Sequence, residues 1–108
     1  MNLNQARAYA MSLPEASEEA HFEFTSFRIR GKIFASAPPD GAFLHVFVDE
    51  ALRDPLIAAN PEQFSALLWG AKVVGVKIKL PAARSSVELL LRESWKRKAP
   101  KKLVSLLP

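Results

Sequence analysis

The sequence predicts an α+β fold, a two-layer sandwich in which one antiparallel sheet carries the two terminal helices packed on one face. Three observations predict it. Apolar residues recur at helical spacing near both ends of the chain, segments of alternating apolar and polar residues fill the middle, and the connections between segments are short. The other face of the sheet is expected to stay partly open to solvent. A length of 108 residues predicts a single domain over residues 1–108.

The first expected element is a helix over residues 3–13, which carries an apolar stripe. Asn2 and Gln5 have the spacing of a capping box at its start. Pro14 ends the helix because a proline disfavours helical angles at the preceding Leu13. The acidic segment from Glu15 to Glu23 is expected to be a loop that leads into the edge of the sheet.

A β-hairpin is expected next. Residues 27–30 alternate apolar and basic side chains, which places Arg28 and Arg30 on the face opposite Ile29. A two-residue turn at Gly31-Lys32 then pairs Ile29 with Phe34. A turn at residues 38–41 leads into a third strand over residues 42–48, antiparallel to the second.

The second half of the chain predicts a short helix, two strands and a terminal helix. The short helix is capped by Asp49 or Asp54 and stops near residue 60. Strands are expected at residues 64–69 and 73–80, with Lys77 and Lys79 facing away from the core. Ser85 and Glu88 predict a capping box for the last helix, which ends before residue 100 and is followed by a basic turn over residues 101–107.

Composition excludes several classes of protein. The chain has no cysteine, which rules out disulfide scaffolds, thiolate metal sites and cysteine nucleophiles. His21 and His45 lack a second histidine at ligand spacing, and no catalytic arrangement is readable, so we expect no enzyme, no metal and no cofactor. Polar residues interrupt every apolar stretch, so we expect no signal peptide and no membrane span, and a cytoplasmic location.

Charge is distributed unevenly. Residues 1–54 carry five basic and eight acidic side chains, a net charge of −3, whereas residues 55–108 carry ten basic and three acidic ones, a net charge of +7. This asymmetry favours a polyanionic partner. The alternative, an ordinary soluble basic protein, stays open on charge alone.

Two sets of basic residues are the candidate binding residues. The first, in the run WKRKAPKK at residues 95–102, includes Lys98, Lys101 and Lys102; cations there also suit the dipole of a helix end, which is the structural alternative. The second, on the predicted hairpins, comprises Arg28, Arg30, Lys32, Lys77 and Lys79.

Charge beside aromatic platforms is typical of nucleic-acid grooves, and Phe43 and Phe47 are expected on the same open face as the hairpin cations. We therefore expect a non-enzymatic domain that binds nucleic acid, DNA in particular, with little sequence selectivity. The alternative is a protein-interaction or self-associating module, such as a homodimer, that uses the open sheet face.

The chain also resembles the MmcQ/YjbR family across nearly its whole length. Three segments carry the resemblance: LPEA at residues 13–16, SFRIRGKIFA at residues 26–35 and ESWKRKAPK at residues 93–101. The resemblance implies a CyaY-like, frataxin-like α/β sandwich and DNA binding through a double-wing arrangement of hairpins. Many members have a tryptophan near the start of the last strand, where this chain has Gly75. The acidic ridge with which frataxins bind iron is missing, because the first helix has no acidic residue before Glu15.

Overall fold

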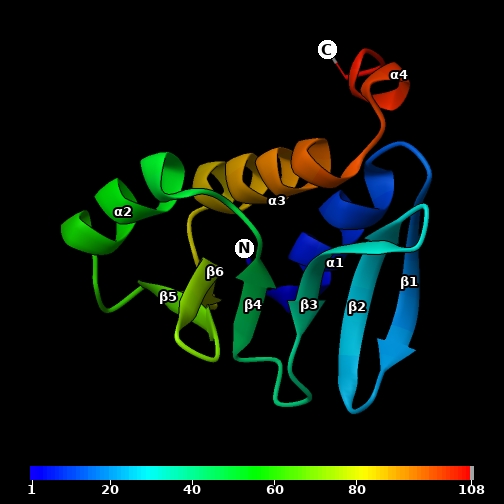
Figure 1. The fold of residues 1–108 in the computed structure, drawn as a ribbon. Coiled ribbons are helices and arrows are strands. Elements are labelled where there is room, and N and C mark those ends of the chain that lie inside the picture. The colour runs from blue at the N-terminus through cyan, green and yellow to red at the C-terminus, as the bar shows by residue number, and fades with distance from the viewer. Residues whose placement is uncertain (108) are drawn as a thin grey trace.

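A computed structural model describes residues 1–107 of the chain (Figure 1). Its helices and strands are, in chain order, α1 (Leu3–Ser12), β1 (Ala16–His21), β2 (Phe24–Ile29), β3 (Lys32–Ala37), β4 (Phe43–Val46), α2 (Glu50–Ala59), β5 (Phe64–Trp69), β6 (Lys72–Lys79), α3 (Arg84–Lys98) and α4 (Lys101–Val104).

The strands form one six-stranded sheet in the order β1-β2-β3-β4-β6-β5, with all neighbours antiparallel. Helices α1 and α3 lie on the same side of the sheet, and α2 lies beside its β5–β6 end (Figure 1). The predicted α+β two-layer sandwich is therefore confirmed, and the face of the sheet opposite α1 and α3 carries no helix among residues 1–107.

Helix α1 begins and ends as the sequence predicts. The Asn2 side chain accepts a hydrogen bond from the backbone N–H of Gln5 at 2.9 Å, and the Gln5 side chain accepts one from the N–H of Asn2 at 2.8 Å. This reciprocal pair is the capping box. Leu13 is extended, with φ −71° and ψ 147°, so the helix stops one residue before Pro14.

The acidic segment is an edge strand, and the prediction of a loop there was wrong. Strand β1 pairs with β2 along its whole length. Apolar alternation is missing because most of its side chains are exposed at the sheet edge. Its carboxylates instead pair with basic neighbours: Glu18 with Arg7 on α1, and Glu19 with Arg28 on β2.

The turn of the β2–β3 hairpin lies one residue earlier than predicted. Arg30 and Gly31 form it, both with positive φ of 49° and 81°, as the right-handed twist of a tight hairpin favours. Ile29 therefore pairs with Lys32 and not with Phe34. A β-bulge leaves Phe34 without a partner on β2, and its ring is fully buried in the core.

The remaining elements follow the sequence closely, with one exception. Asp49 caps α2 by accepting from the N–H of Leu52 at 3.2 Å. The capping box predicted for α3 is not formed, because the helix already begins at Arg84 and no side chain of residues 1–107 caps it. Glu88 instead receives a hydrogen bond from Arg84 at 3.2 Å.

Helix α3 packs the helical layer against the sheet. Its predicted core residues are all fully buried: Val87, Leu90, Leu91 and Trp95. Ser94 accepts a hydrogen bond from the N–H of Phe47 at 2.9 Å and donates one to the carbonyl of Phe34. The second half of α3 is thereby fixed against β3 and the residue that follows β4. None of the helices in the described chain is long and apolar enough to cross a membrane.

Candidate nucleic-acid interface

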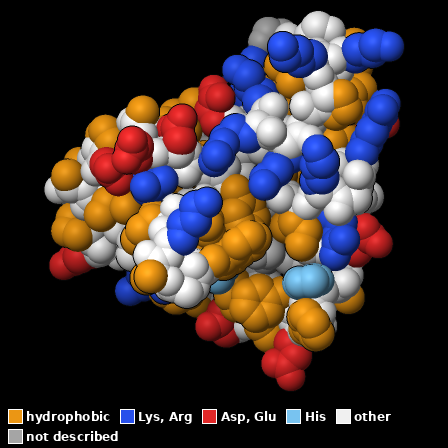
Figure 2. Space-filling model, viewed as in Figure 1, with side chains coloured by type: hydrophobic (Ala, Val, Ile, Leu, Met, Phe, Trp, Pro, Cys, Tyr) orange, Lys and Arg blue, Asp and Glu red, His pale blue; other side chains and the backbone are white. Residues whose placement is uncertain are grey.

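The open face of the sheet is polar along its middle. A single row of side chains crosses five strands there, in the order Ser26, Ser36, His45, Lys77 and Ser65. Over this face hydrophobic side chains gather, and lysine and arginine side chains form a band above them (Figure 2). The face therefore combines charge with apolar surface, as the sequence predicts.

The two predicted arginines are held by carboxylates. Arg28 lies on the open face, but its Nε is 3.4 Å from a Glu19 oxygen and donates to Ser26 Oγ at 3.1 Å. Arg30 is in the turn and not on the strand face, because the hairpin turns one residue early. It makes two hydrogen bonds to Glu15, at 3.1 and 3.2 Å, and these bonds and the Glu15 charge raise the pKa of its guanidinium.

Lys77 and Lys79 face away from the core on β6, as predicted. Lys77 is opposite His45 on β4. Burial of the imidazole and the nearby Lys77 charge lower the pKa of His45, whereas Asp40 acts in the other direction. His45 is therefore neutral near pH 7. Lys79 lies opposite Phe43, at the end of β4 that is far from Phe47. Lys77 and Lys79 are therefore not part of the band of lysine and arginine side chains near Phe47.

Three of the predicted lysines lie at the C-terminal end of the fold. Lys98 places its Nζ 5.3 Å from the centroid of the Phe47 ring. Lys101 and Lys102 are exposed on α4, and Lys32 is exposed beside the β2–β3 turn at the same end of the molecule (Figure 1). Within residues 1–107, none of these four lysines forms an ion pair.

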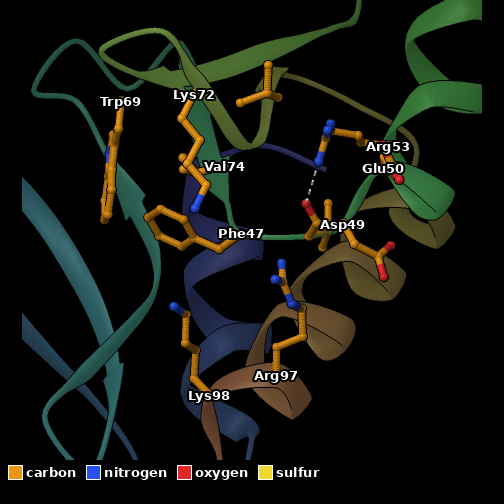
Figure 3. Close-up of a pocket in the computed structure, with 11 residues that line it drawn as sticks. Phe47, Asp49, Glu50, Arg53, Trp69, Lys72, Val74, Arg97 and Lys98 are labelled. Carbon is orange, nitrogen blue, oxygen red and sulfur yellow. Dashed lines mark hydrogen bonds between the residues drawn. The ribbon is translucent and has the colours of Figure 1, made fainter.

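A cleft of about 450 Å³ opens where the loop after β4, the tip of the β5–β6 hairpin and the end of α3 meet. We call it the Trp69 cleft. In Figure 3 the ammonium groups of Lys72 and Lys98 and the guanidinium of Arg97 are directed toward the space around Phe47. Lys72 and Arg97 have no carboxylate partner in the described part of the chain.

Two aromatic rings form the floor and side of the Trp69 cleft. Phe47 and Trp69 have centroids 5.6 Å apart and planes at 63°, an edge-to-face contact. Phe47 is 8% exposed, whereas Trp69 is 65% exposed. In an edge-to-face pair at least one face of each ring stays uncovered by the other ring, so the exposed indole of Trp69 keeps a free aromatic face. Trp69 lines the same cleft as the three cations.

The other charged side chains of the cleft serve the fold. Asp49 caps α2, and Glu50 lies in the first turn of that helix, where a negative charge is favourable. Arg53 donates to the carbonyl of Val48 at 3.3 Å and lies 3.4 Å from Asp54. Four cations and two carboxylates line the cleft, so its net charge is positive.

Sequence reasoning missed Trp69 and Lys72, and it placed Arg97 in the basic run at residues 95–102 without singling it out. Lys72 and Arg97 lie far from each other along the chain and meet only through the fold. One signal was present: a tryptophan directly before Gly70 sits at the exposed end of a strand, beside the turn, where a core residue is not needed. That position marks a large aromatic side chain free for contact.

The structure explains why this chain has Gly75 where many members of the family it resembles have a tryptophan. A Cβ on Gly75 would overlap the carbonyl oxygen of Val46 on the neighbouring strand. A tryptophan there would push β4 and β6 apart. On the partner strand Leu67 pairs with Gly75, and the exposed Trp69 pairs with Lys72 at the turn end of the hairpin.

The histidines and carboxylates do not gather. His21 lies on β1, with its Nδ1 3.5 Å from an Arg28 nitrogen, and His45 lies on β4. Among residues 1–107, no three side chains of histidine, aspartate or glutamate approach closely enough to hold a metal ion. The expectation that the chain needs no metal stays a prediction.

Comparison with known proteins gives the family and the fold. The crystal structure of a Deinococcus radiodurans protein with a DUF419 domain matches at a TM-score of 0.80 and 21% identity, over 99% of this chain and 89% of that one. At that identity the likeness shows the fold alone. No curated protein matches the chain. The sequence model of the YjbR family covers residues 11–97, and the chain therefore belongs to the YjbR family.

Proposed function

We propose that this chain is a non-enzymatic nucleic-acid-binding protein that holds DNA through its phosphates with little sequence selectivity. The observation that carries the proposal is a band of lysines and arginines, from the Trp69 cleft to α4, that have no carboxylate partner among residues 1–107. Lysine contacts to phosphate give affinity but no base reading. The band contains Lys72, Arg97, Lys98, Lys101 and Lys102.

The arrangement favours a polyanion over a purely structural role for these charges. Cations in the last turn of a helix stabilise its dipole, and Lys96, Arg97 and Lys98 occupy that turn of α3. Lys72 lies on a different element, the β5–β6 hairpin, where no helix end needs it. Its convergence with Arg97 and Lys98 on one cleft supports a shared anionic partner.

A binding role also fits the chemistry of the cleft better than catalysis. Among the described residues that line it there is no serine, histidine or cysteine to act as a nucleophile or base, and Asp49 is engaged as a helix cap.

The proposal is tested by fluorescence anisotropy with two labelled DNA duplexes of unrelated sequence. We expect both to bind with similar affinity at low salt, and to weaken to dissociation constants of about 10⁻⁴ to 10⁻⁶ M at physiological salt. Absence of binding to either duplex and to single-stranded DNA or RNA at about 20 mM salt, where screening is weakest, would refute the proposal.

A second candidate function is self-association or protein binding through the open sheet face. Phe22, 93% exposed at the tip of the β1–β2 hairpin, and Phe24, 37% exposed, favour it. The polar row through His45 and Lys77 disfavours a large apolar interface there. Sedimentation at increasing concentration separates the two: this candidate predicts a dimer that Phe22→Ala weakens, and a constant monomer mass contradicts self-association.

A further inference from the structure

We propose that the Trp69 cleft holds one unpaired nucleotide, so that the protein binds single-stranded nucleic acid more tightly than duplex. This inference rests on the proposed function and deepens it. Its basis is the juxtaposition of a free indole face with cations from two different elements around one cleft.

The aromatic part of the cleft suits a base. The indole of Trp69 is 65% exposed, and the edge-to-face contact with Phe47 leaves at least one of its faces uncovered by that ring. Bases stack on such faces whatever their sequence, because every base has a π-face. Phe47 itself is nearly buried, and its backbone N–H donates a hydrogen bond to Ser94, which anchors this side of the cleft to α3.

The charged part of the cleft suits the phosphates on either side of that base. Lys72 enters from the β5–β6 hairpin, and Arg97 and Lys98 enter from the end of α3 (Figure 3). A volume of about 450 Å³ lies within the range of small-ligand sites, roughly 300–1,000 Å³. The cleft is therefore large enough for one nucleotide and too small for a base pair with both backbones.

Duplex DNA cannot use this cleft fully. Its bases are stacked and paired, so reaching Trp69 requires unstacking and unpairing a base, which costs free energy. A single strand has unstacked bases available and does not bear that cost. The duplex keeps the phosphate contacts alone, which predicts weaker binding at equal salt.

Anisotropy and tryptophan fluorescence test the inference together. A labelled oligothymidylate of roughly twelve nucleotides and the duplex of the same length are titrated at about 50 mM salt. We expect the single strand to bind at least about 5-fold more tightly and to quench the protein's fluorescence. The quenching reports on Trp69, because the other tryptophan, Trp95, is fully buried and donates its indole N–H to the carbonyl of Pro14.

Variants assign the effect to the indole. Trp69→Ala should lower single-strand affinity between about 5-fold and 150-fold, the range that removal of one stacking aromatic produces, and change duplex affinity less than about twofold. Trp69→Phe should keep most of the affinity while losing the fluorescence change. Leu68→Ala is the matched control, because Leu68 is the neighbouring residue on β5, is 54% exposed and lies outside the cleft.

The outcomes are distinct for the inference and for the proposed function. If duplex binds as tightly as the single strand, or Trp69→Ala weakens both equally, the nucleotide site is wrong and non-specific phosphate binding stands. If neither form binds, both proposals are wrong. Equal losses in Trp69→Ala and Leu68→Ala, with a lowered melting temperature, would also overturn the inference, because they would indicate damage to the hairpin.

Discussion

Whether a basic side chain can contact a phosphate depends on what already holds it. Arg28 and Arg30 are each paired with a glutamate of the β1 region, so a phosphate must displace a carboxylate to reach them. The Lys98 ammonium lies over the ring of Phe47, and such a cation–π contact leaves it able to bind an anion. Side chains of equal formal charge therefore differ in how readily they can contact a phosphate.

The ion pairs of Arg28 and Arg30 can be tested by removing their carboxylate partners. Changing Glu15 and Glu19 together to glutamine removes both partners and frees two guanidinium groups. DNA affinity should rise, and the slope of log affinity against log salt should steepen by up to about 1.8, or 0.9 for each new phosphate contact. Anisotropy over a salt series measures it. An unchanged slope would show that Arg28 and Arg30 lie away from the bound DNA.

His45 gives a pH test. Its pKa is lowered in the folded protein by burial and by Lys77, whereas in the unfolded chain it returns to about 6.5. Above that pH the imidazole is neutral in both states. As the pH falls, the unfolded chain binds the proton first, so the folded state loses stability below about pH 6.5. His45→Gln should reduce the fall in melting temperature between pH 7.5 and pH 5.5; an identical fall in both proteins contradicts this.

At the scale of the elements, Ser94 connects three of them. Its hydroxyl satisfies the N–H of Phe47 and the carbonyl of Phe34, both in the buried region between α3 and the sheet. The same bonds hold the Phe47 ring that underlies the Trp69 cleft. Stability and the candidate site are therefore coupled at this residue.

Ser94→Ala should lower the free energy of unfolding by about 1–3 kcal/mol, because two buried backbone groups lose their partner. Urea denaturation measures it. Ser85→Ala on the same helix is the control, with an expected change within about 0.5 kcal/mol, since Ser85 is exposed and forms no cap. A Ser94→Ala protein as stable as the wild type would show that the two groups find other partners.

Sequence predicted the elements whose signals are local. The capping box at Asn2 and Gln5 depends on residues three apart, and it is formed. Strand β1 could not be recognised, because its side chains pair with arginines on other elements instead of alternating in the core. The β2–β3 turn was displaced by one residue, since arginine rarely adopts the positive φ that Arg30 has.

At the scale of the whole molecule, residues from both halves of the chain share one core, from Ala6 on α1 to Leu103 on α4. We therefore expect unfolding as a single unit. Thermal melts followed by near-UV and far-UV circular dichroism should coincide. Two separated transitions in a monomeric sample would contradict the single-domain prediction.

The candidate site was only partly predictable, because its residues come from distant parts of the chain. Sequence located Lys98, Lys101 and Lys102 as a run, and none of the three pairs with a carboxylate in the part of the chain that the structure describes. It could not show that Trp69 and Lys72 line one cleft with the end of α3, because that depends on where the fold places the tip of the β5–β6 hairpin. Long-range convergence of this kind is visible only in the folded chain.

The central claim, that the cations of α3 and α4 bind phosphate, is tested most directly by the salt dependence of duplex binding. Replacing Lys98, Lys101 and Lys102 together by glutamine should reduce the slope of log affinity against log salt by about 2.7 units for every sequence, since each lost contact contributes about 0.9. The control, Arg28→Gln with Arg30→Gln, should change the slope by less than about one unit, because both arginines are already paired. A slope that the triple variant leaves unchanged would contradict the account.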